Sequence, residues 1–436
     1  MTDAEERHGP PPYWNAATRV LFRFFFLYFS LYCLGTQILT SLITLPDGEI
    51  PDLATLWPVR LIPQWAATHV FGVAAPLAYQ DTGSGDRMFD WILAFCILVI
   101  AAIGAGVWTA VDRTSLSYPR LDTWFRIVLR ICLAGQMFVY GMTKAVPLQM
   151  PFPYLAKLVQ PYGTFSPMGV LWASIGVAPA YETFAGCAEL LAGVLLVVPR
   201  TALLGAVVCL MDMIQVFALN MAYDVPVKLF SLHLIVMAVF LIAPEAPRLA
   251  RFFFSDKAVE PSRLAQPFAT RRANRVAAAV QVVIGIVLLG INVAGVRSAW
   301  KTFGPGKPKS AMYGIWDVEE FSIDGQARAA VITDNERWRR AIFDFPSSMA
   351  FQRMDATLAR YRTAIDTQAK TLALTKGDDP KWKASFSFER PAPDQMTLDG
   401  EMDGHATRMR LRLVDHTKFL LLSREFHWIQ EGPFNR

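Results

Sequence analysis

The sequence predicts an α-helical polytopic membrane protein that continues into a soluble antiparallel β-barrel or β-meander domain. Three observations predict this fold class. Of the 436 residues, 53% are hydrophobic and only 18% are charged, a balance that favours a lipid environment. About seven apolar segments with the length needed to cross a bilayer lie before position 300. After position 310, apolar and polar residues alternate, which is typical of half-buried strands.

Charge is distributed unevenly along the chain. Residues 300–436 contain 21 Lys and Arg and 19 Asp and Glu, about half of all charged residues. The net charge of +5 does not indicate a nucleic-acid partner, because the basic residues lie at the ends of apolar segments instead of forming a stripe on a soluble surface. All five cysteines lie in apolar segments without a CxxC pair, so we expect neither a disulfide framework nor a metal site.

The membrane part divides at prolines and at changes in hydropathy. The turns at 199–200 and 224–226 contain Pro, which resists helix continuation. The expected spans are Arg19–Leu45, Met88–Val111, Trp124–Pro147, Tyr181–Pro199, Thr201–Tyr223, Val227–Ala243 and Val276–Val296. The expected domains are an N-terminal tail (1–16), two transmembrane helices with an interfacial loop (17–111), a four-helix bundle (124–244), a basic loop (245–275), a last transmembrane helix (276–297) and a soluble β domain (310–436).

Two loops, Trp57–Phe71 and Leu155–Gly176, are apolar but interrupted by Pro or Gly, so we expect them to be interfacial or re-entrant.

Basic residues predict the orientation of these spans. Lys and Arg are most frequent on the side that holds the N-terminus and the 245–275 loop, and such residues mark the cytoplasmic side. We therefore expect a bacterial inner-membrane protein with a cytoplasmic N-terminus and a periplasmic, extracytoplasmic C-terminal domain.

The tail has the pattern of a β meander. After a Pro, Gly and Lys linker at 303–309, segments such as KASFSFER and RMRLRLV alternate apolar and polar residues, and turn signals such as DG separate them. Gly314-x-Trp316 lies in the first expected strand and resembles the first-strand motif of lipocalin-like barrels. A barrel of this size is filled by its own side chains or holds one small apolar ligand.

Ionisable residues within the membrane segments are the candidate site. They are costly at membrane depth, so each one is a hypothesis about function. They are Arg130, Lys144, Glu182, Glu189, Asp212, Lys228 and His233. Lys144 or Lys228 could pair with Glu182, and Glu189 or Asp212 could pair with Arg130 or His233; a Lys144–Glu189 pair is a further alternative. Such pairs either fix helix packing or form a polar intramembrane pocket for a quinone headgroup, a lipid headgroup or an anion, or for proton relay. No catalytic residue follows from the sequence.

Spans three to six resemble the DoxX family of small four-helix membrane proteins. In that family a helix ending in Gly-x-x-Lys precedes a helix with a Glu and glycines, and then a Thr with a Gly one turn later. The matching residues here are Gly141, Lys144, Glu189, Gly193, Thr201 and Gly205. The resemblance covers about Trp124 to Pro244. The whole chain is similar to a larger bacterial subgroup with two extra N-terminal spans, a TGSGD segment (82–86), a YDVPVK turn (223–228) and a lipocalin-like β tail.

The resemblance implies a redox-associated role, because better-studied relatives are linked to quinone-coupled sulfur oxidation or to oxidative-stress complexes. The chain has no haem ligand pair, flavin fingerprint or CxxC motif, so we expect an accessory subunit that is not catalytic on its own. The expected partners are membrane lipids, a quinone and a redox partner subunit, with no cofactor evident except a quinone. The alternatives are a carrier or receptor that holds a lipid or small apolar ligand in the barrel, and a structural membrane scaffold.

Overall fold

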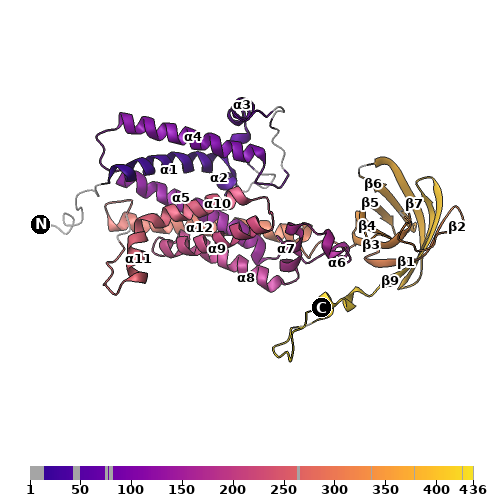
Figure 1. Cartoon of the computed structure of the whole chain (residues 1–436). Helices are drawn as coiled ribbons and strands as arrows, with labels where there is room; N and C mark the ends of the chain where they lie inside the picture. Colours follow the sequence, from indigo (N-terminus) through magenta and orange to yellow (C-terminus); the bar gives the residue numbers. More distant parts are fainter. Residues whose placement is uncertain are drawn as a thin grey trace. The chain divides into compact units, whose positions relative to one another are not determined.

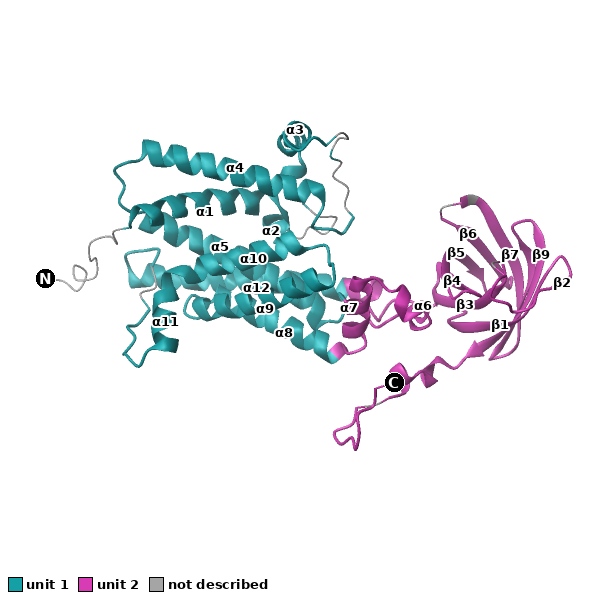
Figure 2. Cartoon of the chain, viewed as in Figure 1, with its two compact units in different colours: residues 1–149, 180–298 teal, residues 150–179, 299–436 magenta. Residues whose placement is uncertain are grey.

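The computed structural model describes residues 14–42, 50–73, 77, 82–262, 266–334, 336–377, 379–424 and 426–435. The chain divides into two compact units, each built from two separate stretches of sequence (Figure 2). The first unit is Met1–Gln149 with Ala180–Ser298, and the second is Met150–Pro179 with Ala299–Arg436. Residues 150–179, which the sequence analysis includes in the four-helix bundle, therefore belong to the same compact unit as the β domain.

Among the described residues, the first unit has seven helices that are long and apolar enough to cross a membrane, so the chain is a multi-pass integral membrane protein. They are α1 (Ala16–Gly35), α4 (Met88–Val111), α5 (Pro119–Ala145), α8 (Pro179–Val197), α9 (Ala202–Ala222), α10 (Lys228–Ile242) and α12 (Arg271–Thr302), as labelled in Figure 1. The sixth span continues from α10 through η3 (Ala243–Glu245) and α11 (Ala246–Phe254). The predicted helical membrane part is confirmed.

Helix α5 is the centre of the first unit. Within its most apolar window, 67% of the residues are buried, against 17% to 44% for the other spans. Its Leu133 and Met137 are fully buried and belong to one apolar cluster with residues of α1, α8, α9 and α10. Gln281 and Leu288 of α12 are also buried. A helix enclosed on most of its surface can carry polar side chains that never face lipid.

Short elements connect the first spans. Helix α1 ends at Gly35, and after Thr36 the chain continues as the four-residue helix α2 (Gln37–Thr40). The 3-10 turn η1 (Leu53–Thr55) and helix α3 (Leu61–His69) precede α4. Helix α3 lies in the loop expected to be interfacial, and its Trp65 side chain is exposed.

The second unit contains a closed antiparallel barrel, as the alternating pattern predicts. Its strands are β1 (Gly314–Ile323), β2 (Gln326–Ala327), β3 (Trp338–Phe345), β4 (Ser348–Arg353), β5 (Leu358–Asp366), β6 (Thr371–Lys376), β7 (Asp379–Ala392), β8 (Gln395–Met402) and β9 (His405–Val414). Strands β3 to β9 follow one another in a meander, and β1 pairs with both β3 and β9, which closes the barrel. The two-residue β2 only extends the edge of β1.

Large side chains fill the barrel interior. Trp316, Phe343, Phe351 and Phe386 are each at most 1% exposed and belong to the same apolar cluster. The Trp316 indole donates a hydrogen bond to the Met312 carbonyl at 3.0 Å. Trp316 of the first strand is therefore a core residue of the barrel, and the nearby Met312 carbonyl satisfies its indole N–H group.

The segment between α5 and α8 packs on the outside of the barrel. It contains α6 (Leu155–Leu158), η2 (Tyr162–Thr164) and α7 (Pro167–Gly176). The buried Leu155 belongs to an apolar cluster that also contains Ile315 and Ile342 of the barrel. The Asp344 carboxylate accepts hydrogen bonds from the backbone N–H groups of Leu155 and Ala156, at 2.8 and 3.3 Å. Burial raises the pKa of Asp344, and these two donors oppose the rise.

This packing fixes one feature of the membrane topology. Residues 150–179 follow α5, and the barrel follows α12, so the spans between them are α8, α9, α10 with its continuation, and α12. Four spans return the chain to the side from which it started. The contact between α6 and the barrel, which requires both segments on one side of the membrane, therefore agrees with the span count. After β9 the chain ends with η4 (His416–Lys418) and α13 (Leu420–Ser423).

Candidate functional site

An ion pair between Lys144 and Glu189 lies inside the helical unit. Lys144 is near the end of α5 and Glu189 is in the middle of α8. The Lys144 Nζ atom donates a hydrogen bond to Glu189 Oε1, and the two side chains are 9% and 3% exposed. Because two charges removed from water repay their desolvation only when they stay paired, either residue alone would be strongly destabilising here.

Glycines bring α5 and α8 together at this pair. A Cβ atom on Gly186 would overlap the backbone of Gly141 and Ala145, and a Cβ atom on Gly141 would lie 2.9 Å from the Leu190 nitrogen. On α8, one turn after Glu189, a Cβ atom on Gly193 would meet the Phe138 ring. Small residues permit this close backbone approach between membrane helices. The glycines therefore set the helix separation at which Lys144 reaches Glu189.

Asp212 of α9 is the third charged residue of this region. It lies within electrostatic reach of both Glu189 and Lys144. Asp212 Oδ2 and Glu189 Oε2 are buried, and neither has a hydrogen-bond partner among the residues that the structure describes. The region therefore has two carboxyl groups for one ammonium group, with one oxygen of each carboxyl group still able to accept a hydrogen bond. Glu182 is fully buried on α8, two turns before Glu189.

The other predicted residues lie beside different partners. The Arg130 guanidinium donates a hydrogen bond to Gln281 of α12. The His233 ring bonds to the Tyr28 hydroxyl at 2.7 Å, and it stacks on Tyr32 with 3.8 Å between ring centroids. Of the seven predicted residues, the structure therefore brings Lys144, Glu189 and Asp212 together. The partners of Arg130 and His233 come from α12 and α1, outside spans three to six.

Lys228 takes part in a contact between two loops, the TGSGD segment (82–86) and the YDVPVK turn (223–228). Asp86, from the TGSGD segment, accepts hydrogen bonds from the backbone N–H groups of Lys228 and Leu229 at 2.8 and 2.9 Å. The Lys228 ammonium group lies 2.8 Å from Asp224 and 3.7 Å from Asp86. Asp86 thus caps the N-terminus of α10, where unsatisfied N–H groups and the helix dipole favour a carboxylate.

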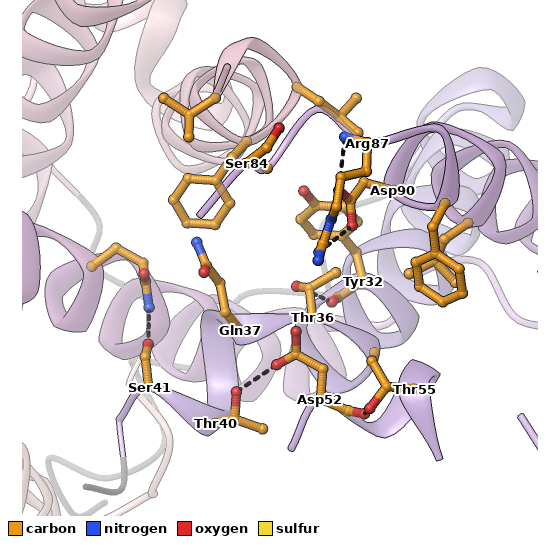
Figure 3. A pocket seen from close by; sticks show the side chains of 18 of the residues that line it. Tyr32, Thr36, Gln37, Thr40, Ser41, Asp52, Thr55, Ser84, Arg87 and Asp90 are labelled. Atoms are coloured by element: carbon orange, nitrogen blue, oxygen red, sulfur yellow. Dashed lines mark hydrogen bonds and ion pairs between the residues drawn. The ribbon is translucent and has the colours of Figure 1, made fainter. Parts of the chain in front are cut away.

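A cavity of about 570 Å³ lies next to this capped end (Figure 3). Its walls come from α1, α2, the 82–87 segment, α4, α5 and the start of α10. The chain ends of α1 and α5 and the chain starts of α4 and α10 meet here, so the cavity opens at one end of the helical unit. In Figure 3 the side chains of Gln37, Ser84, Arg87 and Asp90 surround the same open space.

Hydroxyl, amide and charged groups all contribute to the polar surface of the cavity. The Gln37 amide donates to the Tyr140 hydroxyl at 3.1 Å, and Thr40 donates to Asp52 at 2.8 Å. At another point of the wall, the Gln136 amide donates to the Ser41 hydroxyl at 2.8 Å. Arg87 and Asp90 form an ion pair at 2.8 Å. These groups are suited to a ligand head that both accepts and donates hydrogen bonds.

Tyr140 connects the cavity with the buried ion pair. Its side chain lines the cavity, and its phenol is within electrostatic reach of Glu189. The next residue on α5 is Gly141, which touches α8 beside Glu189. Tyr32 also lines the cavity, and its ring stacks on His233. The predicted residues Glu189 and His233 thus lie behind two phenols of the cavity wall.

Sequence reasoning missed most of the cavity. The candidate residues predicted from the sequence all lie in spans three to six, but many of the lining residues lie between Tyr32 and Leu93. Two signals could have indicated it: the hydroxyl and amide run of Thr36, Gln37, Thr40 and Ser41 after the first span, and the TGSGD segment. Within the described part of the chain, no group of three or more His, Cys, Asp or Glu side chains could hold a metal ion.

One comparison with known proteins gives a relative. Over 122 residues the chain is 32% identical to "Uncharacterized protein YwoB" of Bacillus subtilis (strain 168), in an alignment that covers 26% of this chain and 71% of that protein. No family model matches the chain. No solved structure matches it either.

Proposed function

The chain belongs to the same family as the uncharacterized protein YwoB of Bacillus subtilis, and on this premise we propose a function for its helical unit. The protein is a DoxX-type membrane protein that acts as a redox-associated accessory subunit. Its polar intramembrane cavity binds the headgroup of a membrane-dissolved quinone. The observation that carries this proposal is the cavity of about 570 Å³, with Gln37, Tyr140 and Tyr32 in its wall and the Lys144–Glu189 pair behind Tyr140.

The chemistry of the cavity wall supports a quinone over a charged ligand. A quinone head is flat and has two carbonyl acceptors, and the quinol has two hydroxyl donors. Phenol, amide and hydroxyl groups serve both forms, and an aromatic ring such as Tyr32 provides a flat contact surface. The cavity also contains both signs of charge, since Arg87 pairs with Asp90. A lipid headgroup is the second ligand that this wall fits.

The residues of the DoxX-like motif support the assignment because each has a structural role. Lys144 and Glu189 form the ion pair, and Gly141 and Gly193 permit close helix contact. The Thr201 hydroxyl donates to the Leu195 carbonyl at 2.9 Å in the turn between α8 and α9. A Cβ atom on Gly205 would meet the Leu196 nitrogen at 2.5 Å. The motif therefore builds one packed unit of α5, α8 and α9.

The barrel gives less support to a ligand-carrier function. A carrier barrel needs internal space, whereas the interior here is occupied by large side chains such as Phe343 and Phe386, each at most 1% exposed. The distribution of basic residues supports a cytoplasmic N-terminus, an extracytoplasmic barrel and a bacterial inner-membrane location. In that orientation the cavity opens toward the extracytoplasmic side, because the chain end of α5 leads to the barrel side.

Ligand-induced stabilisation of the intact protein in lipid nanodiscs tests the quinone proposal. Addition of a short-chain ubiquinone or menaquinone analogue is expected to raise the melting temperature, because a ligand that binds only the folded state stabilises it. Tyr140→Phe removes the hydroxyl that bonds to Gln37 and is expected to weaken quinone affinity about fivefold, the equivalent of one neutral hydrogen bond of about 1 kcal/mol.

Tyr181→Phe is the matched control, because it makes the same change on α8 at a side chain that is 49% exposed and outside the cavity lining. It is expected to leave quinone affinity unchanged. If neither quinone class stabilises the wild-type protein at saturating concentration, the quinone proposal is wrong. Equal losses for both variants would place the binding site elsewhere. Stabilisation by a phospholipid headgroup analogue alone would assign the cavity to a lipid.

A further inference from the structure

A second hollow of the helical unit lies outside the polar cavity, between α5 and α12. It has a volume of about 700 Å³. Its walls include Ile127, Val128 and Ile131 of α5, and Val276, Val280 and Ile284 of α12. These side chains belong to two membrane-spanning helices. The groove therefore lies at the depth of the lipid hydrocarbon.

The groove continues beyond Trp124 and Val128. A neighbouring apolar hollow of about 340 Å³ shares Leu39, Trp124, Val128 and Cys132 with it and extends to Phe26 and Phe29 of α1. The two apolar hollows lie side by side, since they share these four lining residues, and together they provide space for the two acyl chains of a lipid. No water is available in the bilayer core to fill them, so hydrocarbon is the occupant that their surface favours.

The polar side chain in the groove wall is already satisfied. Gln281 accepts a hydrogen bond from Arg130, and its amide donates to the Ala277 carbonyl at 2.9 Å. It therefore presents little unsatisfied polarity to an occupant. This arrangement differs from the polar cavity, where hydroxyl and amide groups face open space.

One end of the groove is basic and aromatic. Arg272 and Thr270 line it at the start of α12, together with Trp124 and Phe268, whose rings meet edge to face at 5.6 Å. The first turn of α12 contains no acidic residue, and Arg272 is exposed, with no ion pair to a described residue. Trp belongs at the level of the lipid headgroups. The groove thus has an apolar body and a cationic end at its interfacial edge.

We propose that this groove binds an anionic phospholipid, whose acyl chains lie between α5 and α12 and whose phosphate contacts Arg272. The charge of Arg272 selects the headgroup, and the apolar channels hold the chains. This lipid site is separate from the cavity assigned to a quinone headgroup, so failure of one assignment leaves the other intact.

Native mass spectrometry of the intact protein, after exchange into nanodiscs of defined lipid, tests the headgroup contact. Phosphatidylglycerol is expected to remain bound more tightly than phosphatidylcholine. Arg272→Gln is expected to lower phosphatidylglycerol affinity about fivefold, since one basic residue near a membrane surface contributes about 1 kcal/mol. Arg275→Gln is the matched control, because Arg275 is an exposed residue of the same helix end that does not line the groove.

Occlusion of the groove tests the acyl chains independently. Val280→Phe adds bulk inside the groove and is expected to lower retention of both lipids, whereas Val283→Phe adds the same bulk on α12 outside its lining and is expected to have no effect. Equal lipid retention in all variants would overturn the proposal. A loss for Arg272→Gln without a loss for Val280→Phe would also overturn it, because the phosphate would then bind only at the surface. Inorganic phosphate is expected to compete poorly with phosphatidylglycerol, and full competition would contradict a lipid occupant.

Discussion

The two units of this protein both have an apolar core, but they differ in how many ionisable side chains they bury. In the helical unit, the buried residues include Arg130, Lys144, Glu182, Glu189 and His233. In the barrel, the interior is mainly aromatic and aliphatic, and ion pairs such as Arg412–Glu319 are on the surface. The buried Arg337 is the exception among the described residues, and its guanidinium donates to the Arg328 carbonyl at 2.9 Å. Burial of charge is costly in both environments. The buried charges of the helical unit therefore make it the first place to test for function, whereas the barrel interior is filled by its own side chains.

The largest expected effect comes from breaking the buried pair in the helical unit. Lys144→Met or Glu189→Met alone is expected to destabilise the protein by about 3–5 kcal/mol, because each leaves a buried charge without its hydrogen-bonded partner inside the helix bundle. The double variant is expected to cost less than either single one. The measurement is the unfolding free energy of all four proteins in the same detergent. Additive costs would mean that the two side chains do not act as a pair.

The barrel is expected to respond to loss of volume instead of loss of charge. Leu398 is fully buried, and Leu398→Ala is expected to destabilise the barrel by about 2–5 kcal/mol through lost burial and the cavity left behind. Hydrogen exchange of β8 and β9 in the intact protein measures this. Leu420→Ala makes the same change at a side chain that is 56% exposed and is expected to cost less than about 0.5 kcal/mol. A tolerated Leu398→Ala would contradict a tightly packed interior.

A smaller effect is expected at the contact between the two loops. Asp86→Ala removes the carboxylate that accepts from the Lys228 and Leu229 N–H groups, so we expect a loss of about 0.5–2 kcal/mol. Asp224→Asn removes only the charge of an exposed partner of Lys228 and keeps a residue type that tolerates the φ of 52° at this position, so it is expected to cost less than about 0.5 kcal/mol. Thermal unfolding of both variants compares them. Equal losses would show that the ion pair, and not the helix cap, holds the loops together.

The smallest effect concerns a surface pair at the barrel seam. His405 Nδ1 lies 2.8 Å from Asp324, and this carboxylate raises the pKa of His405 while the histidine lowers the pKa of Asp324. The attraction is therefore present below the ordinary pKa of His405 and is lost as the pH rises through the raised value. It is also lost in acid, as Asp324 becomes protonated. NMR titration is expected to show the His405 pKa falling in Asp324→Asn, and an unchanged pKa would exclude the contact.

Much of the fold is predictable because its signals are local. Apolar length predicts the spans, and period-two alternation predicts the meander of β3 to β9. The Lys144–Glu189 pair can also be predicted from the sequence, since both residues are charged and belong to adjacent spans. The cavity as a whole cannot be predicted in the same way, because its wall combines Gln37, Arg87 and Tyr140, which lie far apart in the sequence. An apolar helix gives no local signal of which neighbour it contacts, so the contacts of His233 with Tyr28 and of Arg130 with Gln281 follow only from the structure.

The packing of α6 on the barrel has a consequence for biogenesis. The ribosome makes residues 150–179 more than a hundred residues before the first barrel strand, so at typical synthesis rates the segment waits on the order of ten seconds or more for its binding surface. The last span must also insert correctly, because a missed crossing would place the barrel strands on the opposite side of the membrane from residues 150–179. Assembly of Leu155 and Asp344 thus reports that the barrel has reached the same side of the membrane as residues 150–179, and a chain in which one crossing is missed would expose both surfaces to quality control.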